Sequence, residues 1–223
     1  MNPPSPRTCR LFIFDLDGTL LDTLEDLAGA VNQGLSLLGF PQHKLESYKY
    51  FVGSGREEMA FRALPEAERQ PLTLKRLVDF IDGYYLQHWA DHTLPYPGIP
   101  DLLDELTARR IKLSILSNKP QIFTDLMVGR LLAKWSFAAV VGATPGVPKK
   151  PDPSAALKIA EKLKLGPRDL VYLGDSDIDM QTAAACGMFA VGALWGFRTA
   201  DELKASGANS LINHPCELLR FFE

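Results

Sequence analysis

Short apolar runs alternate along this chain with stretches of helical pattern. A continuous apolar run of strand length is typical of a strand buried on both faces, and apolar residues at i, i+3, i+4 and i+7 are typical of a helix. Alternating strands and helices predict a parallel sheet with helices on both faces, so we expect an α/β protein with a Rossmann-like parallel core. The runs lie at residues 11–14 (LFIF), 112–116 (KLSIL), 137–141 (FAAVV), 170–173 (LVYL) and 189–194 (FAVGAL).

One long segment interrupts this alternation. Residues 22–88 contain apolar residues at helical spacing and no convincing strand. Thr23 and Asp26 are expected to form a capping box at the start of the first of these helices. We therefore expect an α/β core domain made of residues 1–21 and 89–223, with an inserted helical domain made of residues 22–88.

The composition excludes several functional classes. The 223 residues carry a net charge of −3 at pH 7, so no basic field would hold nucleic acid or an anionic membrane surface. The apolar runs are far shorter than a membrane span, and LFIF is too short for the apolar region of a secretory signal. A cytoplasmic location is therefore expected. The three widely spaced cysteines, Cys9, Cys186 and Cys216, are expected to be buried thiols without disulfides.

The polar residues that follow the predicted strands indicate a functional site. Asp15 and Asp17 end the first run, Ser117 follows the second, and GDSDID (174–179) ends the fourth. Two lysines lie in the connecting segment VPKKPDP (147–153). Ligands of open parallel sheets bind beyond the carboxyl ends of the strands. Folding is therefore expected to gather acids, a hydroxyl and a lysine at one edge of the sheet.

Carboxylates gathered in this way suit a hard cation. Magnesium prefers oxygen ligands, and Asp15 with Asp175 would suit it. An EF-hand calcium loop is the alternative, but Met180 stands where that loop needs glycine and Cys186 where it needs glutamate. A carboxylate can also attack a phosphate when cations offset the repulsion, while a second acid protonates the leaving group. The i, i+2 spacing of Asp15 and Asp17 would put both on one side of an extended strand.

Four segments, taken in order, resemble the motifs of the haloacid dehalogenase-like hydrolase superfamily. They are DLDGTLLDT (15–23), SN (117–118), KKPDP (149–153) and GDSDID (174–179), and the likeness covers essentially the whole chain. The resemblance implies a magnesium-dependent phosphatase that hydrolyses a small phosphorylated metabolite through an aspartyl-phosphate intermediate. It also implies that residues 22–88 form a helical cap domain.

The resemblance further implies roles for individual residues. Asp15 would be the nucleophile and Asp17 the general acid and base. Ser117 and the backbone N–H of Asn118 would hold the phosphoryl group, and Lys150 would steady the charge on nucleophile and phosphate. The implied magnesium ligands are Asp15, Asp17 through its backbone carbonyl, Asp175 and Asp179.

Within the superfamily, the segments FVGSGREEMAFRAL (51–64) and LSNKP (116–120) most resemble those of phosphoglycolate phosphatases. By this resemblance, a cap loop would face the active site, and its arginine could pair with a substrate carboxylate. The residues of that loop are Gly53, Ser54, Gly55 and Arg56.

Several alternatives stay open. A β-phosphoglucomutase-like phosphosugar mutase or an inorganic pyrophosphatase would also keep Asp17. A non-enzymatic receiver-type phosphoacceptor domain combines acids, a hydroxyl, a lysine and magnesium too, although such domains lack a helical insertion. Lys149 could enter the site in place of Lys150. Asp177 could support the metal or be a bystander, and Lys119 could flank the substrate or lie in a solvated loop.

Overall fold

The structure is a computed structural model that describes residues 9–222. The chain divides into two compact units. Unit 1 takes in the described residues through Leu21 and from Pro95 onward, and unit 2 is Asp22–Leu94. Unit 2 thus begins at residue 22, as the expected insertion does, and continues past residue 88 to Leu94.

Unit 1 contains a six-stranded sheet in which neighbouring strands pair in parallel, with the order β5-β4-β1-β6-β7-β8. Each of the five apolar runs forms a strand, which confirms the predicted α/β parallel core. The sequence pattern missed β8 because it is only three residues long, and β4 continues past Ser117 instead of ending before it. The strands are β1 (Leu11–Phe14), β4 (Lys112–Pro120), β5 (Ala139–Ala143), β6 (Leu170–Gly174), β7 (Phe189–Ala193) and β8 (Ser210–Ile212).

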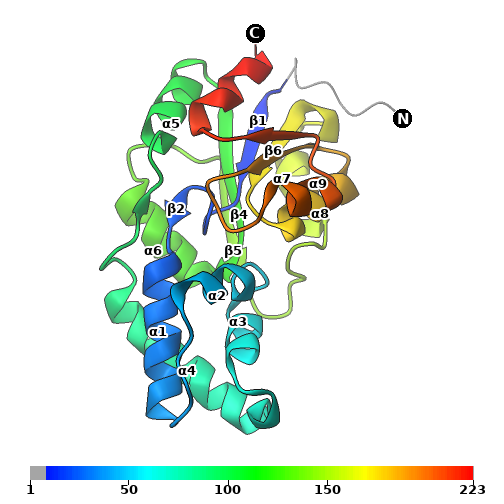
Figure 1. Cartoon of the computed structure of the whole chain (residues 1–223). Helices are drawn as coiled ribbons and strands as arrows, with labels where there is room; N and C mark the ends of the chain where they lie inside the picture. The colour runs from blue at the N-terminus through cyan, green and yellow to red at the C-terminus, as the bar shows by residue number, and fades with distance from the viewer. Residues whose placement is uncertain (1–8, 223) are drawn as a thin grey trace. The chain divides into compact units, whose positions relative to one another are not determined.

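Helices cover both faces of this sheet (Figure 1). The helices α5 and α6 pack on one face, and α7, α8 and α9 pack on the other. The chain builds outward from β1 to β4 and β5, and then crosses to β6 on the other side of β1. The neighbours β1 and β6 therefore mark the point where the strand order reverses, at which open α/β sheets bind their ligands. The helical elements of unit 1 are α5 (Ile99–Ala108), α6 (Gln121–Leu131), α7 (Ser154–Lys162), η3 (Pro167–Asp169), α8 (Asp177–Cys186), α9 (Ala200–Ala205) and η4 (Pro215–Phe222).

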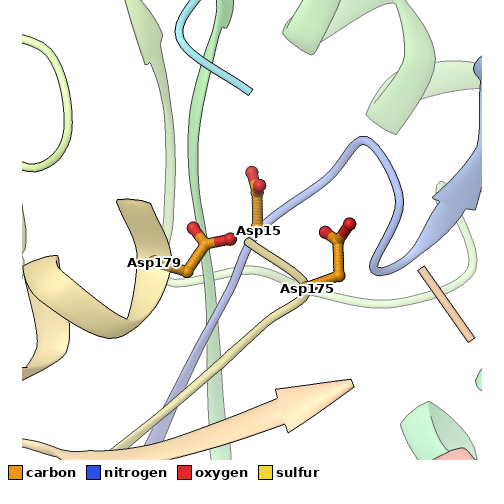
Figure 2. A group of neighbouring side chains, drawn as sticks. All are labelled: Asp15, Asp175 and Asp179. Carbon is orange, nitrogen blue, oxygen red and sulfur yellow. The ribbon is translucent and has the colours of Figure 1, made fainter. Parts of the chain in front are cut away.

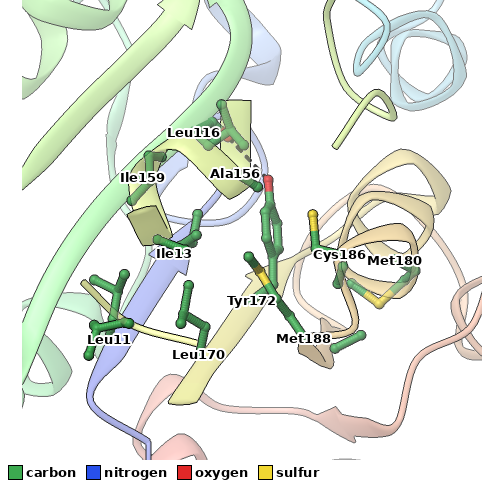
Figure 3. Close-up of a cluster of buried hydrophobic side chains, with 14 of the residues drawn as sticks. Leu11, Ile13, Leu116, Ala156, Ile159, Leu170, Tyr172, Met180, Cys186 and Met188 are labelled. Carbon is green, nitrogen blue, oxygen red and sulfur yellow. Dashed lines mark hydrogen bonds between the residues drawn. The ribbon is translucent and has the colours of Figure 1, made fainter. Parts of the chain in front are cut away.

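A buried apolar cluster fixes α7 and α8 against β1 and β6 (Figure 3). Alternate side chains of β1, Leu11 and Ile13, belong to this cluster together with Ile159 of α7 and Met180 of α8. Burying one such aliphatic side chain stabilises the fold by roughly 1.5–3 kcal/mol. Tyr172 of β6 lies in the same cluster, and its hydroxyl reaches the backbone oxygen of Leu116 at 3.3 Å. This packing fixes the positions of β1 and β6, whose carboxyl ends carry the polar residues.

Unit 2 is built from helices. They are α1 (Leu24–Leu37), α2 (Leu45–Phe51), α3 (Arg56–Ala63), η2 (Glu66–Glu68) and α4 (Pro71–His88). Two short strands, β2 (Leu21–Asp22) and β3 (Leu94–Pro95), pair with each other where the chain passes between the units.

The predicted capping box of α1 is wrong. Thr23 occupies the N-cap position, but its side chain makes no capping hydrogen bond. The carboxylate of Asp26 instead accepts hydrogen bonds from the backbone N–H groups of His92 and Thr93 and from the Thr93 hydroxyl, the last at 2.6 Å. Asp26 therefore fastens the start of unit 2 to its end.

The cysteines are free, as expected, and Cys9 and Cys186 are buried. The expectation that Cys216 is also buried is wrong, because it is half-exposed on η4. Within residues 9–222, none of the helices combines the length and the hydropathy that crossing a membrane requires.

Candidate active site

Three carboxylates meet in unit 1 at the point where the strand order reverses (Figure 2). Asp15 follows β1, Asp175 follows β6, and Asp179 lies in the first turn of α8. All three are buried, and they offer oxygen atoms within 4.8 Å of one another. Phe14 pairs with Leu173 in the β1/β6 register, so the residues that follow the two strands emerge side by side. The structure thus brings together the acids that the strand ends predicted.

The side chain of Lys150 lies among these acids. Its Nζ is 2.9 Å from Oδ1 of Asp15 and 2.7 Å from Oδ1 of Asp179, and only 2% of the side chain is exposed. Lys149 is exposed, so the cation inside the cluster is Lys150. The side-chain amide of Asn118 donates to the Lys150 carbonyl at 3.0 Å and accepts from its N–H at 2.8 Å. No sequence motif indicates this reciprocal pair, which holds the lysine segment against β4.

Asp179 is held by the chain on both of its oxygen atoms. Ser176, the N-cap residue of α8, donates from Oγ to Asp179 Oδ2 at 2.6 Å, and its N–H donates to the same atom at 3.1 Å. Lys150 and the Tyr172 hydroxyl donate to Oδ1, at 2.7 and 3.3 Å. These contacts make Asp179 a fixed negative charge beside Lys150. Asp177 stands apart from the clustered acids and lies 3.4 Å from Nε of Arg198.

Asp175 is enclosed by the loops that follow β1 and β7. The Thr19 hydroxyl donates to Oδ1 at 2.8 Å, and the backbone N–H of Phe197 donates to Oδ2 at 2.8 Å. Glycines allow both loops to approach this closely. A Cβ on Gly18 would lie 2.4 Å from Asp175 Oδ2, and a Cβ on Gly196 would lie 2.2 Å from Asp175 Cβ. The orientation of Asp175 is therefore set by backbone and side-chain donors that the sequence motifs did not reveal.

The close packing of these ionisable side chains shifts their pKa values. Burial, reinforced by the charge of Asp179, raises the pKa of Asp15 well above its usual range despite the opposing effect of Lys150. The same two causes raise the pKa of Asp175 to about 7. Burial lowers the pKa of Lys150, but the neighbouring Asp15 and Asp179 outweigh burial and raise it well above its ordinary value.

These residues fit a divalent cation. Three acids surround a single lysine, so the cluster has an excess of negative charge, and the atoms that it offers are carboxylate oxygens. Magnesium prefers such ligands. Asp15 and Asp175 are the side chains that would bind it, because each oxygen of Asp179 already accepts two hydrogen bonds from the chain, whereas each oxygen of Asp175 accepts one. Asp179 would then stabilise the ion by its negative charge and Lys150 by its ion pair.

Asp17 lies outside the cluster of three acids and pairs with Lys119. Nζ of Lys119 is 3.0 and 3.2 Å from the two carboxylate oxygens of Asp17. The chain turns directly after Asp17, where Gly18 adopts a φ of +82° and its N–H donates to the Leu21 carbonyl. The interpretation of Lys119 as a solvated loop residue is wrong, because it lies on β4 with a side chain only 3% exposed.

Ser117 is buried near the carboxyl end of β4. In the β1/β4 register Ile115 is opposite Phe14, so Ser117 lies one residue beyond the level of Asp15. Ser117 also lines a small pocket at the ends of β4 and β5, together with Asn118 and Lys150. This pocket lies on the β4/β5 side of the carboxyl edge, and Asp15 is not among the residues that line it.

The remaining predicted residues form a separate group in unit 2. Gly53, Ser54 and Gly55 connect α2 to α3, and the two glycines adopt φ values of +116° and +95°, which other residues rarely adopt. Arg56 begins α3, and its guanidinium pairs with Asp82 of α4. The part that this loop plays in substrate binding stays a prediction.

Comparison with known proteins gives a consistent result. Residues 12–193 match the model of a family described as haloacid dehalogenase-like hydrolase. A phosphoglycolate phosphatase from Chromobacterium violaceum is 34% identical, with 92% of each chain covered. A second one, from Pseudomonas putida, is 32% identical and covers 92% of this chain and 76% of the relative.

A solved structure shows the same fold. The crystal structure of a proposed phosphoglycolate phosphatase from Lactobacillus delbrueckii subsp. bulgaricus has a TM-score of 0.88 and 31% identity, and the match covers 94% of this chain and 96% of that one. These matches argue against the receiver-type alternative, since they extend over the helical insertion as well as the sheet. The chain therefore belongs to the haloacid dehalogenase-like hydrolase family, in which it is a hydrolase of the phosphatase type.

Proposed function

We propose that this protein is a magnesium-dependent phosphatase that forms an aspartyl-phosphate on Asp15 and acts on a small phosphorylated metabolite, with phosphoglycolate as the first candidate. The observation that carries the proposal is the position of Asp15, with Lys150 Nζ 2.9 Å away and Asp175 beside it. The names of the similar proteins support the substrate, because relatives that match over most of this chain are phosphoglycolate phosphatases.

The proposed reaction has two steps. In the first, a carboxylate oxygen of Asp15 attacks the phosphorus of the monoester, the bond from phosphorus to the leaving oxygen breaks, and Asp17 gives that oxygen a proton. In the second, Asp17 takes a proton from a water molecule whose oxygen attacks the phosphorus, which releases inorganic phosphate and the Asp15 carboxylate. The sum is hydrolysis of one phosphate ester bond by one water.

The other residues of the cluster would balance charge and hold the phosphoryl group. Lys150 offsets the repulsion between Asp15 and the phosphate oxygens, and Ser117 Oγ with the Asn118 N–H binds those oxygens. Magnesium held by Asp15, Asp175 and the Asp17 carbonyl, with Asp179 in support, would add Lewis-acid stabilisation of the same charge.

We also propose that residues 22–88 act as a cap on a core made of residues 1–21 and 89–223. In that role Gly53, Ser54, Gly55 and Arg56 would recognise the leaving group. The guanidinium of Arg56 pairs with Asp82 within unit 2, and the 32% of its side chain that stays exposed supports this role because a substrate carboxylate can still reach it. The cytoplasmic location also stays a prediction.

The test is a measurement of initial rates of phosphate release with Mg²⁺ and after treatment with EDTA. The substrates are 2-phosphoglycolate, other phosphomonoesters, pyrophosphate and β-glucose 1-phosphate, the last also assayed for isomerisation. Asp15→Asn is expected to abolish turnover while the fold is retained, because the side-chain volume is kept. Asp125→Asn, a change at an exposed aspartate on α6, serves as the matched control. A preference for isomerisation, or activity of Asp15→Asn near that of the wild type, would overturn the proposal.

A further inference from the structure

The ion pair between Lys119 and Asp17 differs from an ordinary surface pair. Both side chains are largely withdrawn from solvent, with 3% of Lys119 and 12% of Asp17 exposed. The ammonium also contacts both oxygens of one carboxylate, at 3.0 and 3.2 Å. Exposed pairs contribute little because solvent screens them and the side chains move, and burial removes both effects. Contacts to both oxygens therefore fix the rotation of the Asp17 carboxylate as well as its distance.

The backbone of Lys119 is anchored by an irregularity in β4. Leu116 pairs with Val141 and Pro120 with Ala143, so residues 117–119 of β4 lie opposite the single residue Gly142 of β5. Such irregularities redirect a side chain and often lie next to active sites.

Contacts on both sides then hold this stretch in place. The Lys119 N–H donates to Ser117 Oγ at 3.2 Å, and the Thr124 hydroxyl lies 3.3 Å from the Lys119 carbonyl. A Cβ on Gly142 would lie 2.8 Å from that same carbonyl oxygen, so the close approach needs glycine. The ammonium of Lys119 is therefore presented from a rigid part of the sheet.

The turn that carries Asp17 does not depend on this ion pair for its shape. The Gly18 N–H donates to the Leu21 carbonyl at 2.9 Å, and the N–H groups of Leu20 and Leu21 donate to the Leu16 carbonyl at 3.0 Å each. These backbone bonds define the loop after β1. What Lys119 adds is control of the Asp17 side chain, at the cost of desolvating an ammonium, which a purely structural contact between apolar residues would avoid.

Resting on the proposed function, we propose that Lys119 is the positioning residue of the general acid and base Asp17. It holds the Asp17 carboxyl group in the same orientation in both forms, protonated when it gives a proton to the leaving oxygen and ionised when it takes one from water. Because Lys119 acts through Asp17, replacing Lys119 should slow the first step most for leaving groups that require protonation. An alcohol needs it in the transition state, whereas p-nitrophenol leaves readily as the anion.

The expected effect of Lys119→Met is therefore selective. The rate of the first step with an alkyl phosphate should fall about 10- to 100-fold, which reaches the cost of a misplaced catalytic group and stays below the full loss of general-acid catalysis. With p-nitrophenyl phosphate the same step should fall less than about threefold, because little proton transfer is lost. A purely structural role of Lys119 would lower the two rates by the same factor.

The experiment measures the release of the leaving group by the full chain in single turnovers, with Mg²⁺, by rapid quench. The substrates are 2-phosphoglycolate and p-nitrophenyl phosphate. Lys112→Met, a change at an exposed lysine at the opposite end of β4, is the matched control and should alter neither rate. Thermal unfolding shows whether each variant folds, and Lys119→Gln replaces Lys119→Met if the latter does not.

A double variant adds a second readout. If Lys119 acts through Asp17, adding Lys119→Met to Asp17→Asn should leave the ratio of the two rates unchanged, because the proton donor is already absent. An equal loss on both substrates, or a further change of the ratio in the double variant, overturns the inference while the proposed function stands. A wild-type protein that hydrolyses neither substrate overturns the proposed function and the inference with it.

Discussion

Replacing Asp175 by asparagine should stabilise the metal-free protein at alkaline pH. Burial and the charge of Asp179 raise the pKa of Asp175 from 3.8 to about 7 in the folded state. A difference of roughly three pKa units corresponds to about 4 kcal/mol of unfolding free energy that the ionised carboxylate costs the folded state. Asparagine removes this charge at the same volume, but it can accept only one of the hydrogen bonds from Thr19 and Phe197. Losing the other costs about 1–2 kcal/mol, so a net gain of about 2–3 kcal/mol is expected at pH 8.

The sign of the pH dependence follows from the raised pKa. Below pH 4 Asp175 is protonated in both the folded and the unfolded protein, so its charge does not weaken the fold. As the pH rises toward 7, the unfolded state loses its proton first, and the wild-type protein becomes progressively less stable. The gain from Asp175→Asn should therefore be large at pH 8 and should disappear or reverse at pH 5.

Urea denaturation followed by circular dichroism, in EDTA at pH 5, 6, 7 and 8, measures this difference. With Mg²⁺ added at pH 8 the order should reverse, because the wild-type protein gains the stabilisation of a bound ion and the variant loses a ligand. A variant that is less stable than the wild type at pH 8 in EDTA would refute the reasoning, as would a difference that does not change with pH.

Three further outcomes are expected. Gly196→Ala should lower stability by about 1–3 kcal/mol and weaken Mn²⁺ binding measured by electron paramagnetic resonance, because the new Cβ meets Asp175. Gly129→Ala, on a helix with open space around it, should do neither. Lys150→Met should abolish turnover and lower the urea midpoint more at pH 8 than at pH 5, because it removes the cation that Asp15 and Asp179 share; an equal loss at both pH values would count against this. Arg56→Ala should raise KM for carboxylated substrates more than for p-nitrophenyl phosphate, and equal increases would remove Arg56 from substrate recognition.

The parts of the fold that local pattern determines could be predicted from the sequence. Continuous apolar runs located the central strands, and the acids at their ends predicted that Asp15 and Asp175 would meet, because parallel strands present their carboxyl ends at one edge. The pattern failed where a contact joins distant segments. The pattern predicts that Asp26 caps its own helix. Its carboxylate instead accepts hydrogen bonds from His92 and Thr93, which lie 66 and 67 positions further along the chain.

In the site, too, contacts between distant segments could not be predicted from local pattern. Thr19 contacts Asp175 across 156 positions of sequence, and Lys119 contacts Asp17 across 102. Neither pair has a spacing that a local rule would recognise, and a lysine near the end of a strand is equally compatible with solvent. The irregularity in β4 that presents Lys119 depends on the close approach of Gly142, which only the assembled sheet reveals.

The most direct test of the central claim is to look for the phosphoryl group on the protein during turnover. The wild-type chain is mixed with substrate and Mg²⁺, quenched in acid within milliseconds, digested, and analysed by mass spectrometry. We expect a phosphoryl group on the peptide that contains Asp15, located at that residue, and none in the Asp15→Asn variant. Rapid hydrolysis with no phosphorylated peptide, or with the group on another residue, would contradict it.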